Sequence, residues 1–296
     1  MDTELLQNCE SIAKEWCTSN VYDKRTQEEV KAMMANEDKT ELIEAFYKTL
    51  EFGTGGLRGI MGPGTNRMNI YIVGAATQGL ANYLNKNFAG KSISVVVGHD
   101  CRNNSRLFAE TVADIFTANG IKVYLFDDMR PTPEVSFAIR HLGCQSGVNI
   151  TASHNPRQWN ALKMLNENGE FLNAAEANEV IELAEKVEDF NYADVDHLGK
   201  YTEDFTYGQK HIDLVKSLEL VDVEAIRRAD FHVAIDAVNS VGGVILPELL
   251  QQIGVSHVTG LYMEPTGDFQ HNPEPLEKNL GDLKALMKKG GQDIGF

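Results

Sequence analysis

Apolar residues recur at three- and four-residue intervals along the first 50 positions of the chain, a spacing typical of amphipathic helices. One such run starts near the N-terminus, and a second lies between Asp38, a possible N-cap, and Leu50. The apolar positions of the two runs are Leu5, Leu6, Cys9, Ile12, Ala13 and Trp16, followed by Leu42, Ile43, Ala45 and Phe46. The pattern predicts a helical N-terminal segment in which each helix buries one face.

Beyond a glycine-rich stretch, short β-branched runs alternate with longer helical patterns. Two of the predicted helices are followed by glycine where helices commonly end, at Gly120 and Gly143. Apolar strands that alternate with helices are typical of a parallel sheet covered on both faces. The predicted strands cover residues 92–98, 121–126 and 146–150, and the predicted helices cover residues 75–88, 104–118, 131–141 and 173–187.

A polar segment, Glu188–Glu203, is the best candidate for a linker because it holds few aliphatic residues. After it the α/β pattern starts again, so we divide the chain into a first domain, residues 1–203, and a second domain, residues 204–296. The last residues, 292–296, look like the beginning of a strand, which favours a shortened second domain. The second domain is predicted to contain helices at 205–218, 221–229 and 244–253 and strands at 231–235 and 258–262.

Charge and cysteine content narrow the possible functions. The 296 residues carry 27 Lys and Arg against 43 Asp and Glu, a net charge of −16. This balance argues against a general nucleic-acid or anionic-membrane binder, although a small phosphorylated ligand needs only a few local donors. The acidic N-terminus lacks the pattern of an export signal, no apolar run is long enough to span a bilayer, and the four cysteines are widely spaced. We therefore expect a cytoplasmic protein with reduced cysteines.

The segment Thr151–Pro156 (TASHNP) directly follows a predicted strand, at the sheet edge where open α/β folds bind ligands. Ser153, with Lys163 nearby in sequence, could accept a phosphoryl group and pass it on. We expect the side chains of Ser153 and His154 to diverge in extended backbone, which disfavours a nucleophile–base pair made by these two alone. The alternative is an ordinary turn, which Ser, Asn and Pro favour for backbone reasons.

The segment Phe52–Asn69 contains six glycines, two arginines and no acidic residue, although the chain as a whole is acidic. Glycine lets the backbone approach a ligand and exposes N–H donors, and the guanidinium groups of Arg58 and Arg67 suit phosphate oxygens. The spacing does not complete the dinucleotide-binding pattern G-x-G-x-x-G, and no strand of convincing length is predicted before it. The alternative is a flexible surface loop.

Together these segments resemble the α-D-phosphohexomutases, the family of phosphoglucomutase and phosphomannomutase. Residues 52–59 (FGTGGLRG) resemble the first active-site loop of that family, and residues 151–156 resemble its phosphoserine loop. Residues 160–163 (NALK) are similar to the N-G-x-K that follows, with Ala161 in place of glycine, which should constrain the backbone. The resemblance covers the first two of the family's four domains. It implies an α/β fold of two consecutive three-layer αβα domains with mixed, mostly parallel sheets.

The resemblance implies a mutase that interconverts hexose 1-phosphate and hexose 6-phosphate through a phosphoserine and a bisphosphorylated sugar. Ser153 would carry the phosphoryl group, while Lys163 and Arg58 would transfer the proton and stabilise charge in the transition state. A neighbouring cation could hold the pKa of Lys163 low enough for it to act as a base. His154 is counted with the catalytic residues, and His154 and Asn155 would contact phosphate or hold the loop. The phosphate-binding side chains would be those of Arg58, Arg67, His154, Asn155 and Asn160.

The resemblance also implies magnesium, since phosphoryl transfer depends on neutralising oxygen charge, and glucose 1,6-bisphosphate as the activating phosphoryl donor. Ser153 would be the metal ligand in this chain, and the family's D-x-D-x-D ligands are expected beyond Phe296. The expected partners are a small phosphosugar and the C-terminal domains of the same chain, so we expect little or no activity from these residues alone. The alternative is a non-catalytic phosphosugar-binding or regulatory module of the same fold.

Overall fold

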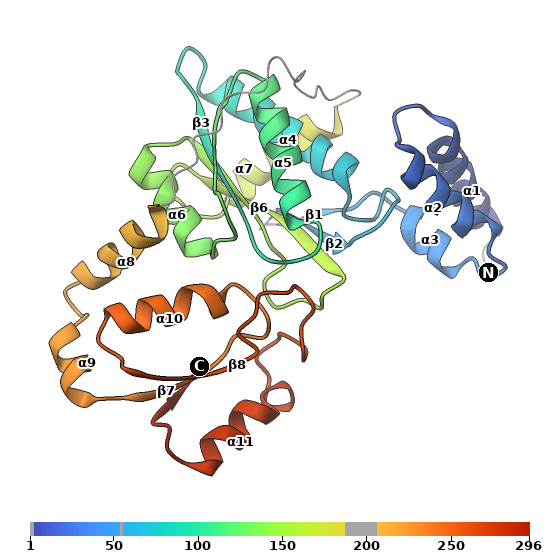
Figure 1. Ribbon diagram of the computed structural model, residues 1–296. Coiled ribbons are helices and arrows are strands. Elements are labelled where there is room, and N and C mark those ends of the chain that lie inside the picture. The colour runs from blue at the N-terminus through green and yellow to red at the C-terminus, as the bar shows by residue number, and fades with distance from the viewer. Residues whose placement is uncertain (1–2, 54–55, 187–205) are drawn as a thin grey trace.

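The computed structural model describes residues 3–53, 56–186 and 206–296. We distinguish an N-terminal helical module (residues 3–47), a first unit (residues 49–186) and a second unit (residues 206–296). Figure 1 shows the helical module at one side of the first unit and the second unit below it.

The N-terminal helical module confirms the helices predicted from apolar spacing and adds one between them. It consists of α1 (Thr3–Thr18), α2 (Lys24–Ala35) and α3 (Thr40–Phe46). The N-cap of α3 is Lys39 and not Asp38 as predicted, although the Asp38 side chain accepts a hydrogen bond from the backbone N of Thr40, 2.9 Å away. Helix α3 ends before Leu50. The module has its own apolar core, which contains Cys9, Ala13, Trp16, Val30, Leu42 and Phe46.

Tyr71, a buried residue of the first unit, fastens the helical module to it. The Tyr71 hydroxyl accepts a hydrogen bond from the backbone N of Asp23 at 2.7 Å and donates one to the Asp23 carboxylate at 2.8 Å. The Tyr71 ring also meets Trp16 and Tyr22 edge-on. Burial alone would raise the pKa of Asp23, but hydrogen bonds from Thr26 and Tyr71 outweigh burial and lower it to about 2.

The first unit is built on a six-stranded sheet in the order β1-β2-β6-β5-β3-β4. Strand β3 pairs in parallel with β4 and β5, whereas β1 with β2, β2 with β6 and β5 with β6 are antiparallel. The three strands predicted from β-branched runs are β3, β4 and β5, and all three are confirmed. The bounds are β1 (Phe52–Gly53), β2 (Gly56–Ile60), β3 (Ser94–His99), β4 (Lys122–Leu125), β5 (Ser146–Ile150) and β6 (Trp159–Asn166).

Strands β2 and β6 were not predicted, and β2 corrects the interpretation of the glycine-rich segment as a loop. Polar residues interrupt β6, and glycines interrupt β2, so neither reads as a strand by apolar content. The two strands pair with Arg58 opposite Ala161. Glycine is required at position 56, because its φ is +101° and a Cβ there would lie 1.9 Å from the carbonyl oxygen of Leu162.

Helices cover both faces of this sheet, which confirms the predicted three-layer arrangement. Side chains alternate along β3, so that Val95 and Val97 face one cluster while Val96 faces another. The first cluster lies under α4, α5 and α7, and the second lies under α6. The bounds are α4 (Ile70–Asn87), α5 (Ser105–Ala118), α6 (Thr132–Leu142) and α7 (Ala174–Glu185), so α4 begins five residues earlier than predicted.

The second unit contains a parallel three-stranded sheet in the order β8-β7-β9. Four of the seven pairings between described strands are parallel, so the sheets are mixed and mostly parallel as predicted. The strands are β7 (His232–Asp236), β8 (His257–Leu261) and β9 (Ile294–Gly295), and the helices are α8 (Tyr207–Ser217), α9 (Val223–Ala229), α10 (Gly242–Gln252), η2 (Glu277–Asn279) and α11 (Gly281–Lys289). Helix α11 was not predicted.

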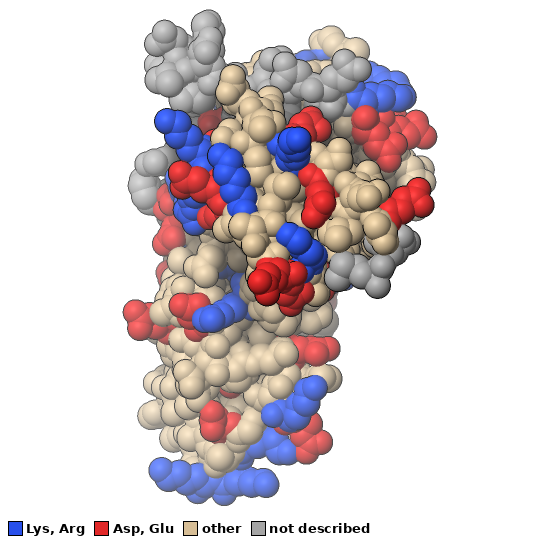
Figure 2. Space-filling model, turned by 90° about the vertical axis from the view of Figure 1, so that its right-hand side faces the viewer, with Lys and Arg blue, Asp and Glu red and all other residues tan. Residues whose placement is uncertain are grey.

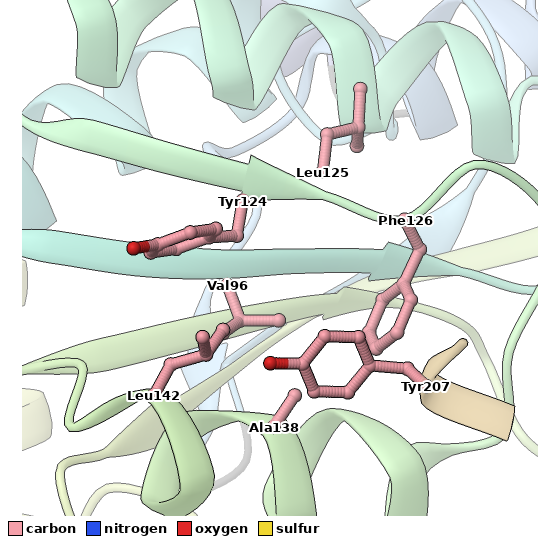
Figure 3. Close-up of a pocket in the computed structure, with 7 residues that line it drawn as sticks. All are labelled: Val96, Tyr124, Leu125, Phe126, Ala138, Leu142 and Tyr207. Atoms are coloured by element: carbon pink, nitrogen blue, oxygen red, sulfur yellow. The ribbon is translucent and has the colours of Figure 1, made fainter. Parts of the chain in front are cut away.

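Tyr207 at the start of α8 packs on the first unit. Figure 3 shows its ring beside Phe126 and above Ala138, and the Tyr207 and Phe126 ring centroids are 5.9 Å apart in an edge-on arrangement. The cavity left between these residues is only about 20 Å³. The predicted linker, 188–203, and the domain boundary after residue 203 lie outside the described residues.

Charged side chains of both signs share the surface (Figure 2), and the cysteines are unpaired. On the face that Figure 2 presents, Lys and Arg side chains are interspersed with Asp and Glu and form no continuous basic surface. All four cysteines are free. Within the ranges that the structure describes, no helix combines the length and the apolar content needed to cross a bilayer.

Candidate functional site

Ser153 lies in an exposed turn that follows the carboxyl end of β5. Its φ of +55° is in the left-handed region, and its backbone N donates to the hydroxyl of Thr151 at 3.1 Å. This turn corrects the expectation that the Ser153 and His154 side chains diverge. The Ser153 Oγ lies 3.3 Å from Nδ1 of His154, because the left-handed residue folds the chain back on itself.

Arg58 and Asn155 join the two sequence segments that were singled out. Arg58 lies on β2, and its Nη1 donates a hydrogen bond of 3.3 Å to the side-chain oxygen of Asn155. The two residues are 97 positions apart in the chain. The antiparallel pairing of β2 with β6 places Arg58 opposite Ala161, just after the turn that carries Ser153. The Arg58 guanidinium therefore contacts a residue that is two positions from Ser153 in the sequence.

Lys163 lies on β6 in a half-buried position beside this guanidinium. Burial lowers the pKa of Lys163, the nearby cation Arg58 lowers it further, and Asp100 opposes the shift. The ammonium group lies 5.3 Å from the centre of the Phe171 ring. The largest cause of this lowering is burial, and the crowding by a like charge considered from the sequence comes second.

The side chains of these residues line two cavities. One, of about 420 Å³, is lined by Arg58, Lys163 and Phe171, together with Ala161 and the backbone of the glycine-rich segment. The other, of about 390 Å³, lies between the first and second units and is lined by Ser153 and His154. Lys163 and Ser153 thus line different cavities, and the hydrogen bond from Arg58 to Asn155 connects the two sets of residues.

The structure does not support direct phosphate contact by Asn160, which corrects that expectation. Asn160 is fully buried and its amide N donates to Ser105 Oγ at 2.9 Å. Its side-chain oxygen accepts from the backbone N of Ala161 at 2.8 Å. Both ends of the Asn160 amide are therefore engaged inside the first unit, where they fix the start of β6.

Arg67 is also separated from the serine site. It is 8% exposed, lies 3.6 Å from the carboxylate of Glu44 and lines a further cavity with residues of α2, including Glu29 and Met33. Neither Ser153 nor Lys163 lines that cavity. The structure thus joins Arg58 to Asn155 of the serine turn, keeps Lys163 beside Arg58 in the neighbouring cavity, and leaves Arg67 at the border of the helical module.

Two arginines at this site were missed from the sequence. Arg130 lines the Ser153 cavity, where Asp127 (2.9 Å) and Glu134 (3.4 Å) hold its guanidinium. Arg102, which is buried, donates hydrogen bonds to carbonyl oxygens of the serine turn. Arg102 follows the carboxyl end of β3, and Arg130 follows that of β4. Because ligands bind at this edge of a parallel sheet, these positions could have identified both arginines as candidate site residues from the sequence.

The described residues do not by themselves form a magnesium site. Magnesium requires near-octahedral oxygen ligation, usually with one or two carboxylates. Asp100 is the only carboxylate that lines the Ser153 cavity in the described part of the chain. Its Oδ1 accepts from Arg102 N and Ser105 Oγ, and its Oδ2 is paired with Arg102 Nε at 3.2 Å. Ser153 therefore has no carboxylate partner available for a shared ion among these residues.

One group of potential metal ligands lies elsewhere, at the amino-terminal ends of β7 and β8. Ligand atoms of Asp230, His232 and His257 lie within 4.8 Å of one another, because strand register places the two histidines side by side. Sequence spacing gave no sign of this group, since the histidines lie on separate strands far apart in the chain. It lies at the opposite end of β7 from Ser240, which lines the serine cavity.

Two sequence-family descriptions match the chain. Residues 49–190 match "Phosphoglucomutase/phosphomannomutase, alpha/beta/alpha domain I", and residues 209–296 match "Phosphoglucomutase/phosphomannomutase, alpha/beta/alpha domain II". The chain belongs to the phosphoglucomutase/phosphomannomutase family. The predicted family resemblance is thereby confirmed, and the two matches cover both α/β units.

Several members of the phosphoglucomutase/phosphomannomutase family are similar to the chain. Human phosphopentomutase is 44% identical over 151 residues, which are 49% of this chain and 25% of that protein. Phosphoglucomutase of Staphylococcus epidermidis is 31% identical over 254 residues, which are 83% of this chain and 46% of that protein. A structure from Thermus thermophilus, assigned as a phosphomannomutase, superimposes with a TM-score of 0.71 at 27% identity and covers 81% of this chain and 52% of its own. The chain thus spans between a quarter and about half of the length of these relatives.

Proposed function

We propose that the gene product containing this chain is a phosphosugar mutase. It would interconvert a hexose 1-phosphate and a hexose 6-phosphate through phosphorylated Ser153 and a bisphosphorylated sugar. The observation that carries the proposal is the hydrogen bond from Arg58 to Asn155, which unites the glycine-rich segment with the serine turn. The exposed hydroxyl, the guanidinium and a lysine of lowered pKa then supply a phosphoryl carrier, a charge-stabilising group and a base.

A sugar hydroxyl attacks the phosphorus on Ser153, the bond from phosphorus to Ser153 Oγ breaks, and a new bond joins phosphorus to the sugar oxygen. The hydroxyl proton passes to a base, for which the neutral amine of Lys163 is our candidate. The departing serine oxygen takes up a proton and becomes a hydroxyl again, and His154, whose Nδ1 lies 3.3 Å from Ser153 Oγ, is our candidate for the donor. The reverse transfer returns the other phosphate of the bisphosphorylated sugar to Ser153.

Arg58 supports the transfer electrostatically in this proposal. Charge on the phosphoryl oxygens spreads in the transition state, and the planar guanidinium that bonds to Asn155 of the serine turn is suited to stabilise it. Arg58 also lowers the pKa of Lys163, after the larger effect of burial. The same cation therefore favours the neutral form of the proposed base.

Magnesium is the proposed cofactor, and glucose 1,6-bisphosphate is the proposed phosphoryl donor for activation. When bound, a magnesium ion would neutralise phosphoryl oxygen charge. Since the described residues offer no free carboxylate set beside Ser153, we expect the 296 residues alone to turn over little or no substrate.

The proposal is tested by incubating the gene product with magnesium and isotopically labelled glucose 1,6-bisphosphate. We expect label on Ser153 by mass spectrometry, turnover of glucose, mannose, glucosamine or ribose phosphates at measurable rates, and neither result with Ser153→Ala. An exposed serine outside the site, Ser217→Ala, serves as the control. If substrate binds with no label on Ser153 and no turnover, the chain is a non-catalytic phosphosugar-binding module instead.

A further inference from the structure

One buried guanidinium holds the backbone of the serine turn. Arg102 follows β3, and its side chain is 1% exposed. Its Nη2 donates to the carbonyl oxygens of Ser153 at 2.8 Å and Asn155 at 2.7 Å. Its Nη1 donates to the carbonyl oxygens of Pro156 at 2.9 Å and Trp159 at 3.1 Å. Four carbonyl groups that would otherwise point in different directions therefore converge on one cation.

Arg102 is itself held in place by Asp100. The Asp100 Oδ2 lies 3.2 Å from Nε of Arg102, and the Asp100 Oδ1 accepts from Ser105 Oγ at 2.7 Å. The hydrogen bonds from this fixed guanidinium offset the cost of the left-handed conformation at Ser153, whose φ is +55° and which a non-glycine residue adopts only at a cost. The position of the Ser153 side chain thus depends on Arg102.

A residue of the second unit covers this guanidinium. The centre of the Phe269 ring lies 4.8 Å from Cζ of Arg102, which is a cation–π arrangement. The loop that carries Phe269 presses closely on the first unit, because a Cβ at Gly267 would come within 2.4 Å of the carbonyl oxygen of Cys101. Asp268 of the same loop pairs with Arg157 at 3.0 Å on the surface.

We propose that Phe269 is a positioning residue for Ser153 and acts through Arg102. The inference rests on the proposed phosphoryl transfer at Ser153 and adds that the second unit controls its geometry. The aromatic face excludes water from the guanidinium, and in a drier environment the four hydrogen bonds to the serine turn are stronger. A shift of the second unit away from Cys101 and Arg102 would uncover the guanidinium and loosen the turn.

The structural part of this inference is tested by amide hydrogen exchange on the 296-residue chain. The probes are the N–H groups of Asn155 and Trp159, which bond to Ala152 and Pro156 within the turn. We expect Phe269→Leu to speed exchange at both amides about tenfold, and Phe269→Tyr, which keeps the aromatic face, to leave it unchanged. Exchange within β5 should not change in either variant.

The functional part is tested by steady-state kinetics on the gene product containing this chain. We expect Phe269→Leu to lower kcat about tenfold with KM changed less than about twofold, and Phe269→Tyr to restore kcat. The matched control is Phe88→Leu, because the Phe88 ring also faces a cation, Lys91 at 5.5 Å, but belongs to α4's C-terminal end, away from the serine turn. A global loss of stability would lower the thermal midpoint and accelerate exchange throughout the chain.

The outcomes separate this inference from the proposed function. Faster exchange in Phe269→Leu, combined with no label on Ser153 in the unmodified protein, would support the positioning role of Phe269 and reject the proposed mutase activity. Label on Ser153, combined with unchanged exchange and kcat in Phe269→Leu, would support the mutase activity and overturn the positioning role of Phe269. Arg102→Lys gives a second test, because lysine cannot present two parallel pairs of donors to the carbonyl groups of the turn. Unchanged amide exchange at Asn155 and Trp159 in that variant would also overturn the positioning role of Phe269.

Discussion

The Nη1 of Arg58 donates a hydrogen bond of 3.3 Å to the side-chain oxygen of Asn155. Strand β2 and the serine turn are joined at this point, although 97 positions separate them. The contact depends on β6, which pairs with β2 on one side and β5 on the other. The relationship makes Arg58 the residue whose replacement should most directly test the assembly of the site.

Replacing Arg58 by lysine should slow phosphorylation of Ser153 about 100-fold while leaving the fold intact. Lysine keeps the charge but loses the planar donors that reach Asn155 and the phosphoryl oxygens together. The measurement is the rate of label transfer from glucose 1,6-bisphosphate in the full gene product. Arg25→Lys, in an exposed pair with Glu29, is the control. An unchanged rate in the Arg58 variant would remove Arg58 from the proposed transfer.

Replacing Lys163 by arginine should remove the proposed base. In the unmodified enzyme the transfer rate should rise with pH until Lys163 has lost its proton, and its lowered pKa moves that rise below the ordinary lysine value of 10.5. Arginine stays charged, so the variant should be at least about 100-fold slower and lack this rise. Rate–pH profiles of both proteins, with Lys122→Arg as the control, provide the measurement. A profile that persists in the variant would assign the base elsewhere.

Glu134 should make the first unit less stable as pH rises. Burial raises the pKa of Glu134 to about 7, Arg130 opposes the shift and Glu248 adds to it. The folded state therefore binds more protons than the unfolded state between pH 4.5 and pH 7, so the free energy of unfolding falls as pH rises through that window. Glu134→Gln should be about 1–2 kcal/mol more stable than the unmodified chain at about pH 8 and similar to it at about pH 4.5.

The measurement is the free energy of unfolding in urea, for Glu134→Gln and for the unmodified chain, at both pH values. Glu110→Gln is the matched control, because Glu110 forms an exposed pair with Arg106 on the same unit. It should show no comparable dependence on pH. Equal stability of Glu134→Gln and the unmodified chain at the higher pH would mean that the buried carboxylate carries no penalty.

Tyr71→Phe should destabilise the junction of the helical module with the first unit by about 1 kcal/mol near neutral pH, because Asp23 loses a hydrogen bond to its charged form. The pKa of Asp23 is lowered from 3.8 to about 2, so this stabilisation is present above pH 3.8 and is lost as pH falls through 2. The measurement is the difference in unfolding free energy between the variant and the unmodified chain from neutral pH down to about pH 2. Tyr47→Phe, at an exposed position, should show no such difference.

Sequence patterns were sufficient to predict an element or a site residue where one physical effect dominated its placement. Nearly continuous burial made β3 and β5 visible as apolar runs, and Gly143 ended α6 in a left-handed conformation, at the glycine predicted to follow the helix. Ser153 was predicted from its place after β5, since strand ends at a parallel sheet edge are where ligands bind.

The rest depended on tertiary pairing that local patterns do not contain. Strand β6 mixes Asn160 and Lys163 with apolar residues, and only its position between β2 and β5 gives it a partner on each side. Asn160 shares its segment with Lys163, yet the alternation of side chains along a strand sends Asn160 into the core. The left-handed backbone of Ser153 is fixed by Arg102, 51 positions away, so sequence neighbours could not predict it.

The antiparallel connection from β5 to β6 restricts how this segment can change in length. Lys163 lies opposite Asn149 of β5, and Ala161 lies opposite Arg58 of β2. Inserting or deleting one residue between Thr151 and Gln158 would displace the carbonyl groups that converge on Arg102, or would make β6 slip by one position. A slip of one position exchanges the two faces of a strand, so Lys163 would turn away from Arg58. Homologues that keep this chemistry should therefore tolerate substitutions in the turn far better than insertions or deletions.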